Sequence, residues 1–587
     1  MSDIMQAIPF KTLLTQVLEE YRQKKTVFSV KNIYENSESK SAFDIFSRHL
    51  ELPLGVAAGP HTQLAQNLAA CYAAGARFLE LKTIQKLYGE DLAIPRPCIR
   101  ADDEAYNVEW SSEFCPDDAA TEYIKGYFLC KVLAKEFSFG DPDGFIFNMS
   151  CGYDYEGLKD PSVDKYIETL KNASSHPTYL ECLEVLKLAF EENKFEKIDL
   201  DFIENISPEI CSSLTLSTMH GCPPDEIEKM AMHILEEKRV NLYVKCNPTL
   251  LGYEYVRNIL DDMGYDYIKF GREQFEKDLA QEQAFPMFRR LMARAKEIGL
   301  IFGVKLTNTF QTEIHNQELP GSAMYMSGKA LYPLSLSVAN LLANEFDGKL
   351  PMSFSGGADQ NNLADLLSAN ICPVTVCTIL LKPRGMNNLK KLAEITASAG
   401  LPSASRKQND YGTDRYEEYL AVDKEKIAAM TAVVKENVKY CKSAAMRKKY
   451  DLHKPYVGVR SDDYHCRVLC QSCVDVCPNR ANDIIDIAGD SKVILHIDRN
   501  CNECGNCQFH CVEPCLPYRD RLTLFHSLEL FRDSENQGVC FLGDDKYAFR
   551  VNEGNETTIE AECEYEALPE VIRGLVDAVK SEREYLL

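Results

Sequence analysis

Eight cysteines near the C-terminal end of the chain have the spacing of iron–sulfur ligands. The first motif is Cys466-x3-Cys470-x2-Cys473-x3-Cys477, followed by Pro478, and the second is Cys501-x2-Cys504-x2-Cys507-x3-Cys511. In two-cluster ferredoxins the fourth cysteine of each motif binds the other cluster. We therefore predict two [4Fe–4S] clusters, one on Cys466, Cys470, Cys473 and Cys511, the other on Cys501, Cys504, Cys507 and Cys477.

Both motifs depart from the usual bacterial spacing. Three residues instead of two separate Cys466 from Cys470, and no proline follows Cys511. Because four thiolates in CxxC pairs also bind zinc, two structural zinc sites are the alternative interpretation. Cys515 is an additional thiol to which the spacing assigns no role.

Composition limits the classes of partner and of fold. The 587 residues include 89 acidic and 65 basic side chains, a net charge of −24, which disfavours nucleic acid and anionic membrane surfaces. The sequence has no signal peptide pattern and no long uncharged apolar run, so we expect a cytoplasmic protein without membrane contact. The 23 cysteines then favour reduced thiols and metal ligation over disulfides.

Eight short apolar runs with many β-branched residues recur between residues 50 and 380, most of them separated by segments with helical periodicity. Their first residues are Leu52, Ala76, Asp143, Ser213, Asn241, Ile301, Pro351 and Cys372. This rhythm predicts an α/β fold of the (β/α)8 TIM-barrel type. A doubly wound sheet is the competing fold, but no GxGxxG fingerprint follows any of the runs. One connecting helix is expected to open at Pro223-Pro224-Asp225-Glu226 and to close at Lys238-Arg239.

These elements suggest four regions. We expect a barrel over residues 1–400 with an insertion at about 84–142, because that segment is too long for a simple connection. A helical linker over 401–460 leads to a two-cluster, ferredoxin-like domain over 461–530. Residues 531–587 form a C-terminal extension to which we assign no chemistry.

Polar residues follow most of the predicted strands, where barrel enzymes bind their ligands. They include Lys82, Asn148, Thr218, Lys245, Asn247, Asn308, Thr309, Gly356, Gly357 and Thr378. Glycines after the seventh strand suit a phosphate group, and two strand-end lysines suit a reduced flavin ring. A plain turn and surface lysines are the alternative interpretation.

Several segments, in this order, resemble the selenate reductase FMN/iron–sulfur subunits, a family associated with anaerobic purine breakdown. They are AAGPHTQLAQN from Ala57, LELKTIQ from Leu79, LTLSTMHGCPP from Leu214, KCNPT from Lys245, KLTNT from Lys305, MSGKALYPLSL from Met326 and SFSGGAD from Ser353. The resemblance extends more distantly to the FMN barrels of dihydropyrimidine and dihydroorotate dehydrogenases. Members of the closer family often continue into an FAD and NAD(P)H module, for which this sequence has no counterpart.

The resemblance implies an FMN site and a substrate site. FMN would be held by Ala57, Ala58, Lys82, Asn148, Lys245, Asn308, Gly328, Gly356, Gly357 and Thr378. Asn107, Glu109, Asn247, Asn308 and Thr309 would face the substrate. The proton donor of the distant relatives aligns with Thr218, a poor acid, so we expect His220 or Cys222 to donate instead. A helix-capping His220 and an inert Cys222 are the alternative.

Together these features predict an FMN- and iron–sulfur-dependent reductase of an unsaturated nitrogen heterocycle. Urate or a related oxopurine is the first choice and a dihydropyrimidine-type reaction the second. A non-catalytic electron-transfer subunit is the alternative from another class. The electron donor would be a separate NAD(P)H-oxidising FAD subunit or a ferredoxin, and the sequence leaves open whether the protein forms a homo- or hetero-oligomer.

Overall fold

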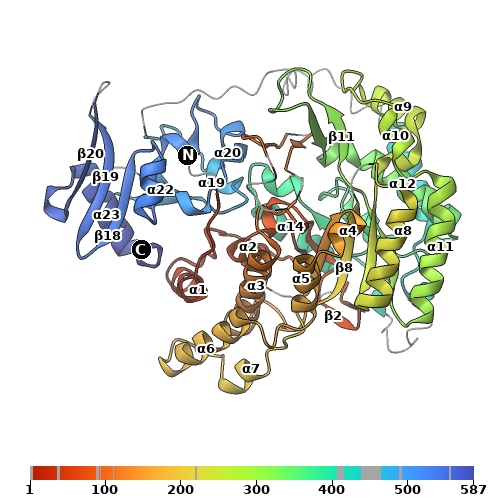
Figure 1. The fold of residues 1–587 in the computed structure, drawn as a ribbon, viewed down its shortest axis with the longest axis horizontal. Coiled ribbons are helices and arrows are strands. Elements are labelled where there is room, and N and C mark those ends of the chain that lie inside the picture. The colour runs from red at the N-terminus through yellow and green to blue at the C-terminus, as the bar shows by residue number, and fades with distance from the viewer. Residues whose placement is uncertain are drawn as a thin grey trace.

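The structure is a computed structural model that describes most of the chain. The described residues are 4–35, 40–87, 92, 94–102, 104–109, 111–218, 221–405, 416–437, 464–487, 492–553 and 557–587. Within them the chain forms a barrel and, beside it, a C-terminal unit (Figure 1).

Eight parallel strands close into a barrel in sequence order, with the last strand pairing with the first. The strands are β3 (Leu54–Val56), β4 (Phe78–Glu80), β7 (Ile146–Tyr153), β8 (Cys211–Thr218), β9 (Asn241–Cys246), β10 (Phe302–Leu306), β13 (Met352–Phe354) and β14 (Val374–Val376). Each strand overlaps one of the eight apolar runs, because parallel strands covered by helices are buried on both faces. The predicted (β/α)8 barrel is confirmed.

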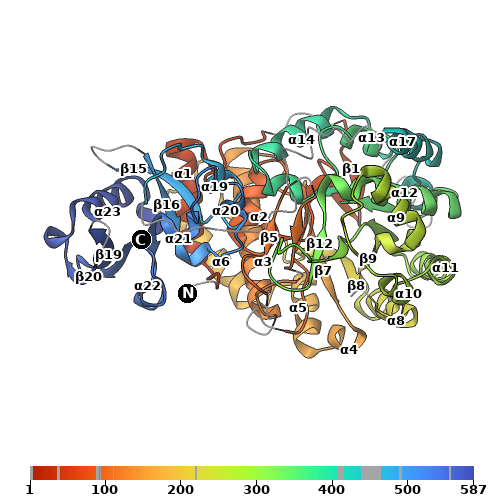
Figure 2. The same cartoon turned by 90° about the horizontal axis from the view of Figure 1, so that it is seen from above.

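Helices cover the outside of the barrel (Figures 1 and 2). They are α2 (Ala65–Ala73), α3 (Pro116–Phe137), α5 (Pro161–Lys171), α6 (Pro177–Glu191), α8 (Pro224–His233), α9 (Tyr253–Met263), α11 (Gln281–Glu297), α12 (Tyr332–Glu345), α13 (Leu363–Ser368) and α14 (Asn387–Ser398). Helix α8 begins at the predicted proline pair, with Asp225 and Glu226 in its first turn. It continues as a π-helical turn over Ile234–Lys238 and ends at Arg239 in the left-handed conformation, as the sequence indicates.

The segment expected to hold an insertion, residues 84–142, divides into two parts. Its first part contributes β5 (Ile99–Arg100) and β6 (Tyr106–Asn107) to a four-stranded sheet with β11 (Phe310–Glu313) and β12 (Ala323–Met326). We call this the mouth sheet. The second part is α3, which packs against α2, α5 and α6 as a barrel helix. The inserted part is therefore shorter than predicted, and half of the mouth sheet comes from residues after β10.

The C-terminal unit is built on one six-stranded sheet. Its strands are β15 (Asn482–Asp486), β16 (Lys492–Ile497), β17 (Leu522–Phe525), β18 (Gly538–Gly543), β19 (Lys546–Glu553) and β20 (Thr557–Glu564). Its helices are α19 (Ser472–Asp475), α20 (Asn506–Phe509), α21 (Pro517–Asp520), α22 (Leu528–Asp533) and α23 (Glu570–Glu582). Because β17 pairs with β18, the sheet runs across the boundary predicted at residues 530 and 531.

The N-terminal segment ties the C-terminal unit to the barrel. The Gln6 N–H donates to the Arg499 carbonyl at 2.8 Å, and Lys24, at the end of α1 (Phe10–Lys24), pairs with Glu582 at 3.0 Å. On the barrel side, Lys125 of α3 donates to the Ile8 carbonyl at 2.7 Å. The predicted linker contributes α16 (Tyr416–Tyr419) and α17 (Lys424–Asn437), and α17 packs on α12. The rest of the linker, apart from residues 401–405 and 420–423, lies outside the described residues. None of the described helices is long and apolar enough to cross a bilayer.

Candidate active site and cysteine groups

A cavity of about 580 Å³ opens between the C-terminal ends of the barrel strands and the mouth sheet. Twelve of the residues predicted to bind cofactor, substrate or proton line it. They are Ala57, Ala58, Lys82, Asn107, Glu109, Thr218, Lys245, Asn308, Thr309, Gly328, Gly357 and Thr378. Residues from every part of the barrel thus meet in one place, as the strand-end argument requires.

Other predicted residues lie around the cavity without lining it. Cys222 and Asn247 line a small adjoining pocket, which shares Thr218 and Lys245 with the cavity. His220 is outside the described residues. Asn148 is in the interior of β7, not at its end, because that strand continues to Tyr153 alongside β8. There the Asn148 amide donates to Thr215 at 2.9 Å.

Closely packed backbone after β13 forms one end of the cavity. A Cβ atom added to Gly357, whose φ is +81°, would lie 2.4 Å from the Gly328 carbonyl oxygen. One added to Gly356, just outside the lining, would lie 1.8 Å from Ser335 Oγ. Only glycine fits at either position. The N–H groups of both glycines donate within the chain, that of Gly356 to the Leu306 carbonyl at 3.2 Å and that of Gly357 to the Ser355 carbonyl at 2.9 Å. Across this end, the hydroxyls of Ser327 and Thr378 are 2.8 Å apart.

Two buried lysines supply positive charge to the cavity wall. Lys82 Nζ pairs with Glu109 Oε1 at 2.6 Å, and both side chains are almost fully shielded from solvent. Burial lowers the pKa of Lys245, an effect opposed by the charge of Glu80 and reinforced by that of Lys82. Fixed cations at these positions suit a ring that becomes anionic on reduction.

The barrel interior directly below the cavity contains an ion pair that sequence reasoning missed. Lys305 Nζ lies 2.9 Å from Glu80 Oε2, and both side chains are buried. Thr215 donates to Glu80 Oε1 at 3.1 Å, and the Ala58 N–H donates to Glu80 Oε2 at 3.3 Å. Since Ala58 lines the cavity, Glu80 links the cavity floor to the interior. A charged residue inside the run LELK was the available signal.

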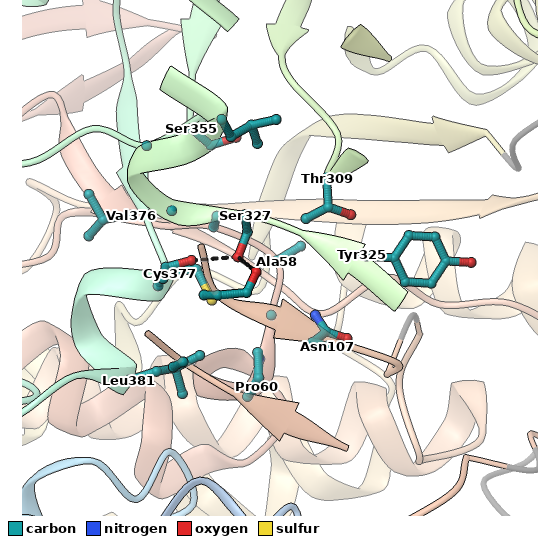
Figure 3. Close-up of a pocket in the computed structure, with 18 of the residues that line it drawn as sticks. Ala58, Pro60, Asn107, Thr309, Tyr325, Ser327, Ser355, Val376, Cys377 and Leu381 are labelled. Atoms are coloured by element: carbon teal, nitrogen blue, oxygen red, sulfur yellow. Dashed lines mark hydrogen bonds between the residues drawn. The ribbon is translucent and has the colours of Figure 1, made fainter. Parts of the chain in front are cut away.

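The mouth sheet brings further polar groups to the cavity. Figure 3 shows Asn107, Thr309 and Tyr325 on one side of the cavity, with Ser327, Val376 and Cys377 on another. Asn107 is on β6 and pairs in register with Tyr325 of β12. The insertion therefore contributes Asn107 to the wall, as predicted, and the second half of the sheet adds Tyr325.

A buried carboxyl group makes the stability of the mouth sheet depend on pH. Burial and the neighbouring Asp102 raise the pKa of Glu104 to about 8, against hydrogen bonds from Tyr267 and Tyr106. The folded state therefore binds more protons than the unfolded state between about pH 4.5 and pH 8, so stability falls as pH rises through this window. We expect the free energy of unfolding to decrease by on the order of a few kcal/mol across this window, since one pKa unit corresponds to about 1.36 kcal/mol. Urea denaturation at pH 5 to 8 measures how the free energy of unfolding depends on pH. The Glu104→Gln variant should show a weaker dependence than the wild-type protein. An unchanged dependence would contradict the role assigned to Glu104.

The eight motif cysteines form two groups in the C-terminal unit. We call Cys477, Cys501, Cys504 and Cys507 the inner group; all four line one small cavity, which Tyr518 also borders. We call Cys466, Cys470, Cys473 and Cys511 the outer group; Cys473 is within electrostatic reach of the other three. Each group therefore contains the fourth cysteine of the other motif. Cys515 lies 3.4 Å from Cys511, sulfur to sulfur.

Backbone N–H groups point at several of these sulfurs. Those of Leu469, Ala481 and Glu503 donate to Cys466, Cys477 and Cys501 at 3.2, 3.2 and 3.3 Å. Such bonds to sulfur are one of the means by which proteins adjust cluster potentials. Among the described residues no three ligating side chains converge tightly enough to hold a single ion, for which tetrahedral zinc would require sulfurs about 3.8 Å apart.

The inner group contacts the wall of the large cavity directly. The Cys504 carbonyl accepts hydrogen bonds from the N–H groups of both Cys98 and Ile99, each at 2.9 Å. The Asn506 amide donates to the Leu381 carbonyl at 2.8 Å. Ile99 and Leu381 both line the cavity. The outer group, by contrast, includes Cys470, which is exposed to solvent.

The fold is a TIM barrel with a cavity at its strand ends, and comparison with known proteins assigns such a barrel to an oxidoreductase family. Residues 28–442 match the family model described as "Oxidoreductase YgfK, N-terminal TIM-barrel domain". The chain belongs to this family.

Two curated relatives, both named "Putative oxidoreductase YgfK" and both from Escherichia coli strains, are 45% identical to the chain over 397 residues. The alignment covers 66% of this chain and 38% of each relative, so the chain matches well under half of their length. Neither the family description nor the relatives' names mention selenate.

Proposed function

We propose that the chain is an FMN- and iron–sulfur-dependent reductase that adds a hydride and a proton to an unsaturated nitrogen heterocycle, most suitably urate or a related oxopurine. The observation that carries the proposal is the contact between the inner cysteine group and the wall of a cavity with two buried lysines and a glycine-lined end. When bound, FMN would supply hydride transfer and the clusters single-electron transfer.

The cavity residues fit FMN. The close-packed backbone at Gly357 and Gly328 adds no side chain to this end of the cavity, and the hydroxyls of Ser327 and Thr378 would hold the phosphate. Lys82 and Lys245 would hold the ring, and Ala57 and Ala58 leave room for it because their side chains are small. The cavity volume of about 580 Å³ is within the range of sites for ligands of this size.

The cysteine groups fit two [4Fe–4S] clusters better than zinc. Each group has four thiols, three from one motif and the fourth from the other as in two-cluster ferredoxins, and the inner thiols surround a small cavity of their own. The exposed Cys470 makes the outer group the natural entry point for electrons from an NAD(P)H-oxidising flavoprotein or a ferredoxin, and the inner group the one that serves the cavity. We propose that the protein works in the cytoplasm.

The choice of a heterocycle rests on the amide and hydroxyl groups opposite the lysines. Asn107, Asn308 and Thr309 line the cavity and pair well with the amide edges of a flat lactam ring. Reduction of an oxyanion such as selenate would favour several arginines, whereas no arginine is among the described residues that line the cavity. The best-supported substrate class is therefore an oxopurine.

The loop after β8 would supply the proton. Of the three candidate donors in this loop, Cys222 is the least suitable. Burial raises the pKa of the Cys222 thiol to about 12, and Cys222 does not line the large cavity. We expect Cys222→Ala to keep turnover within about threefold. His220→Ala should lower turnover by about a hundredfold, in the range of general acid catalysis, with Thr218→Ala also impaired because Thr218 lines the cavity. The measurement is single-turnover flavin reoxidation; a full loss in Cys222→Ala alone would contradict this assignment.

Cofactor analysis of anaerobically purified protein separates the proposed enzyme from an electron-transfer subunit. The enzyme should contain one FMN together with about eight irons and eight sulfides, as expected for two [4Fe–4S] clusters. Iron and sulfide without flavin would favour the electron carrier, and zinc without sulfide would refute the cluster assignment.

A further inference from the structure

Glu109, a residue of the cavity wall, has a buried carboxylate oxygen without a partner in the described part of the chain. Glu109 Oε1 accepts hydrogen bonds from Lys82 Nζ at 2.6 Å and from Gln63 Nε2 at 3.0 Å. The other oxygen, Oε2, is buried and has no hydrogen-bond partner among the described residues. A buried acceptor without a partner is costly, so it is expected to meet a donor from the ligand. Glu109 is ion-paired with Lys82, and an ionised carboxylate only accepts.

The second acceptor is the side-chain carbonyl oxygen of Asn308, and its orientation is set by hydrogen bonds that start at Asp278. Asp278 Oδ2 accepts from Thr249 Oγ1 at 2.7 Å and from Asn247 Nδ2 at 3.1 Å. Because the carboxylate only accepts, Asn247 must turn its NH2 group to Asp278 and its carbonyl oxygen away. That oxygen accepts from Asn308 Nδ2 at 2.9 Å.

This chain of hydrogen bonds sets the orientation of the Asn308 amide. Its NH2 group is directed to Asn247, so its carbonyl oxygen is the atom left to face the cavity that Asn308 lines. Asn107 Oδ1, a further cavity-lining acceptor, is also buried without a partner in the described part of the chain. Asn107 and Asn308 therefore add acceptor oxygens to that of Glu109.

We propose that the cavity selects its substrate by N–H groups, with Glu109 and Asn308 as the acceptors that bind them and Asp278 as the residue that positions Asn308. This inference rests on the proposed function and narrows its substrate to ring systems that carry several lactam N–H groups. Selenate has only acceptor oxygens at neutral pH and cannot satisfy Glu109. A heterocycle with methyl groups in place of its N–H groups fails for the same reason.

The test is binding to the oxidised FMN-loaded protein, followed as the change in flavin absorbance during titration with urate or tetra-N-methylated urate. We expect wild-type protein to bind urate about tenfold to a hundredfold more tightly, the value of a hydrogen bond to a charged group. Glu109→Gln should lower this preference by about tenfold or more. Asp278→Asn, which leaves the Lys82 pair intact, should lower it independently, because an amide at that position no longer fixes Asn247.

Glu104→Gln is the matched control. It alters a buried carboxyl group close to the cavity that does not line it, and it should leave the preference for urate unchanged. If methylation weakens binding only because of its bulk, the preference will persist in both test variants, and the inference falls while the proposed function stands. If neither compound changes the flavin absorbance of wild-type protein, both the inference and the proposed oxopurine substrate are refuted.

Discussion

Replacing Cys504 with serine is expected to slow electron transfer from a reduced ferredoxin to the flavin more than about a hundredfold, since even outer-shell changes at metal sites cost about 10- to 100-fold. Cys504 belongs to the inner group, and its carbonyl accepts the two N–H groups that join the C-terminal unit to the cavity wall. A ferredoxin is too large to enter a cavity of about 580 Å³, so its electrons must pass through the protein.

Stopped-flow absorbance at the flavin band measures this rate, and iron analysis should give about four irons instead of eight per chain. Cys540→Ser is the matched control, because Cys540 is fully buried in β18 of the same unit and belongs to neither group. A Cys504→Ser protein with full iron and the wild-type rate would refute the role of the inner group.

Replacing Glu80 with alanine is expected to lower the free energy of unfolding by about 3–5 kcal/mol, as when one partner of a buried ion pair is removed. The change leaves Lys305 without its carboxylate partner in the barrel interior, where only the hydroxyls of Thr375 and Ser353 remain within hydrogen-bond distance among the described residues. It also removes the acceptor of the Ala58 N–H at the cavity floor.

Urea denaturation followed by circular dichroism measures the loss. Replacing Glu80 and Lys305 together with methionine should recover most of it, because no charge is then buried alone. The surface pair of Arg290 and Glu228, joined by two hydrogen bonds of 2.6 and 2.7 Å, provides the control. Glu228→Ala should cost about 1 kcal/mol or less. If Glu80→Ala were equally mild, the interior pair would have no structural importance.

The barrel could be predicted from the sequence because its strands are buried on both faces and therefore read as apolar runs. The eight runs matched the eight strands, and most of the residues predicted at their ends line one cavity. The end of β7 was misjudged at Asn148, because a small polar residue resembles a strand end. In the structure, pairing with β8 carries the strand to Tyr153.

Other features depend on contacts between distant segments, which a single sequence does not reveal. Residues 310–326 carry no pattern that distinguishes a mouth sheet from a barrel connection. They form β11 and β12, which pair with each other, and β12 also pairs with β6. Asp278 follows a short helix far from β9 in sequence, and only folding brings it to Asn247. The C-terminal sheet likewise continues into residues 531–587, which the sequence suggested to be a separate extension. It does so because β18 pairs with β17.

The central claim is that the cavity binds a flavin that reduces an oxopurine ring. The most direct test is anaerobic: the holoprotein is reduced with dithionite, excess reductant is removed, and flavin absorbance is followed after addition of urate, uracil or selenate. We expect rapid reoxidation by urate and none by uracil or selenate. Flavin that stays reduced with urate but is reoxidised by uracil or selenate would contradict the proposed substrate.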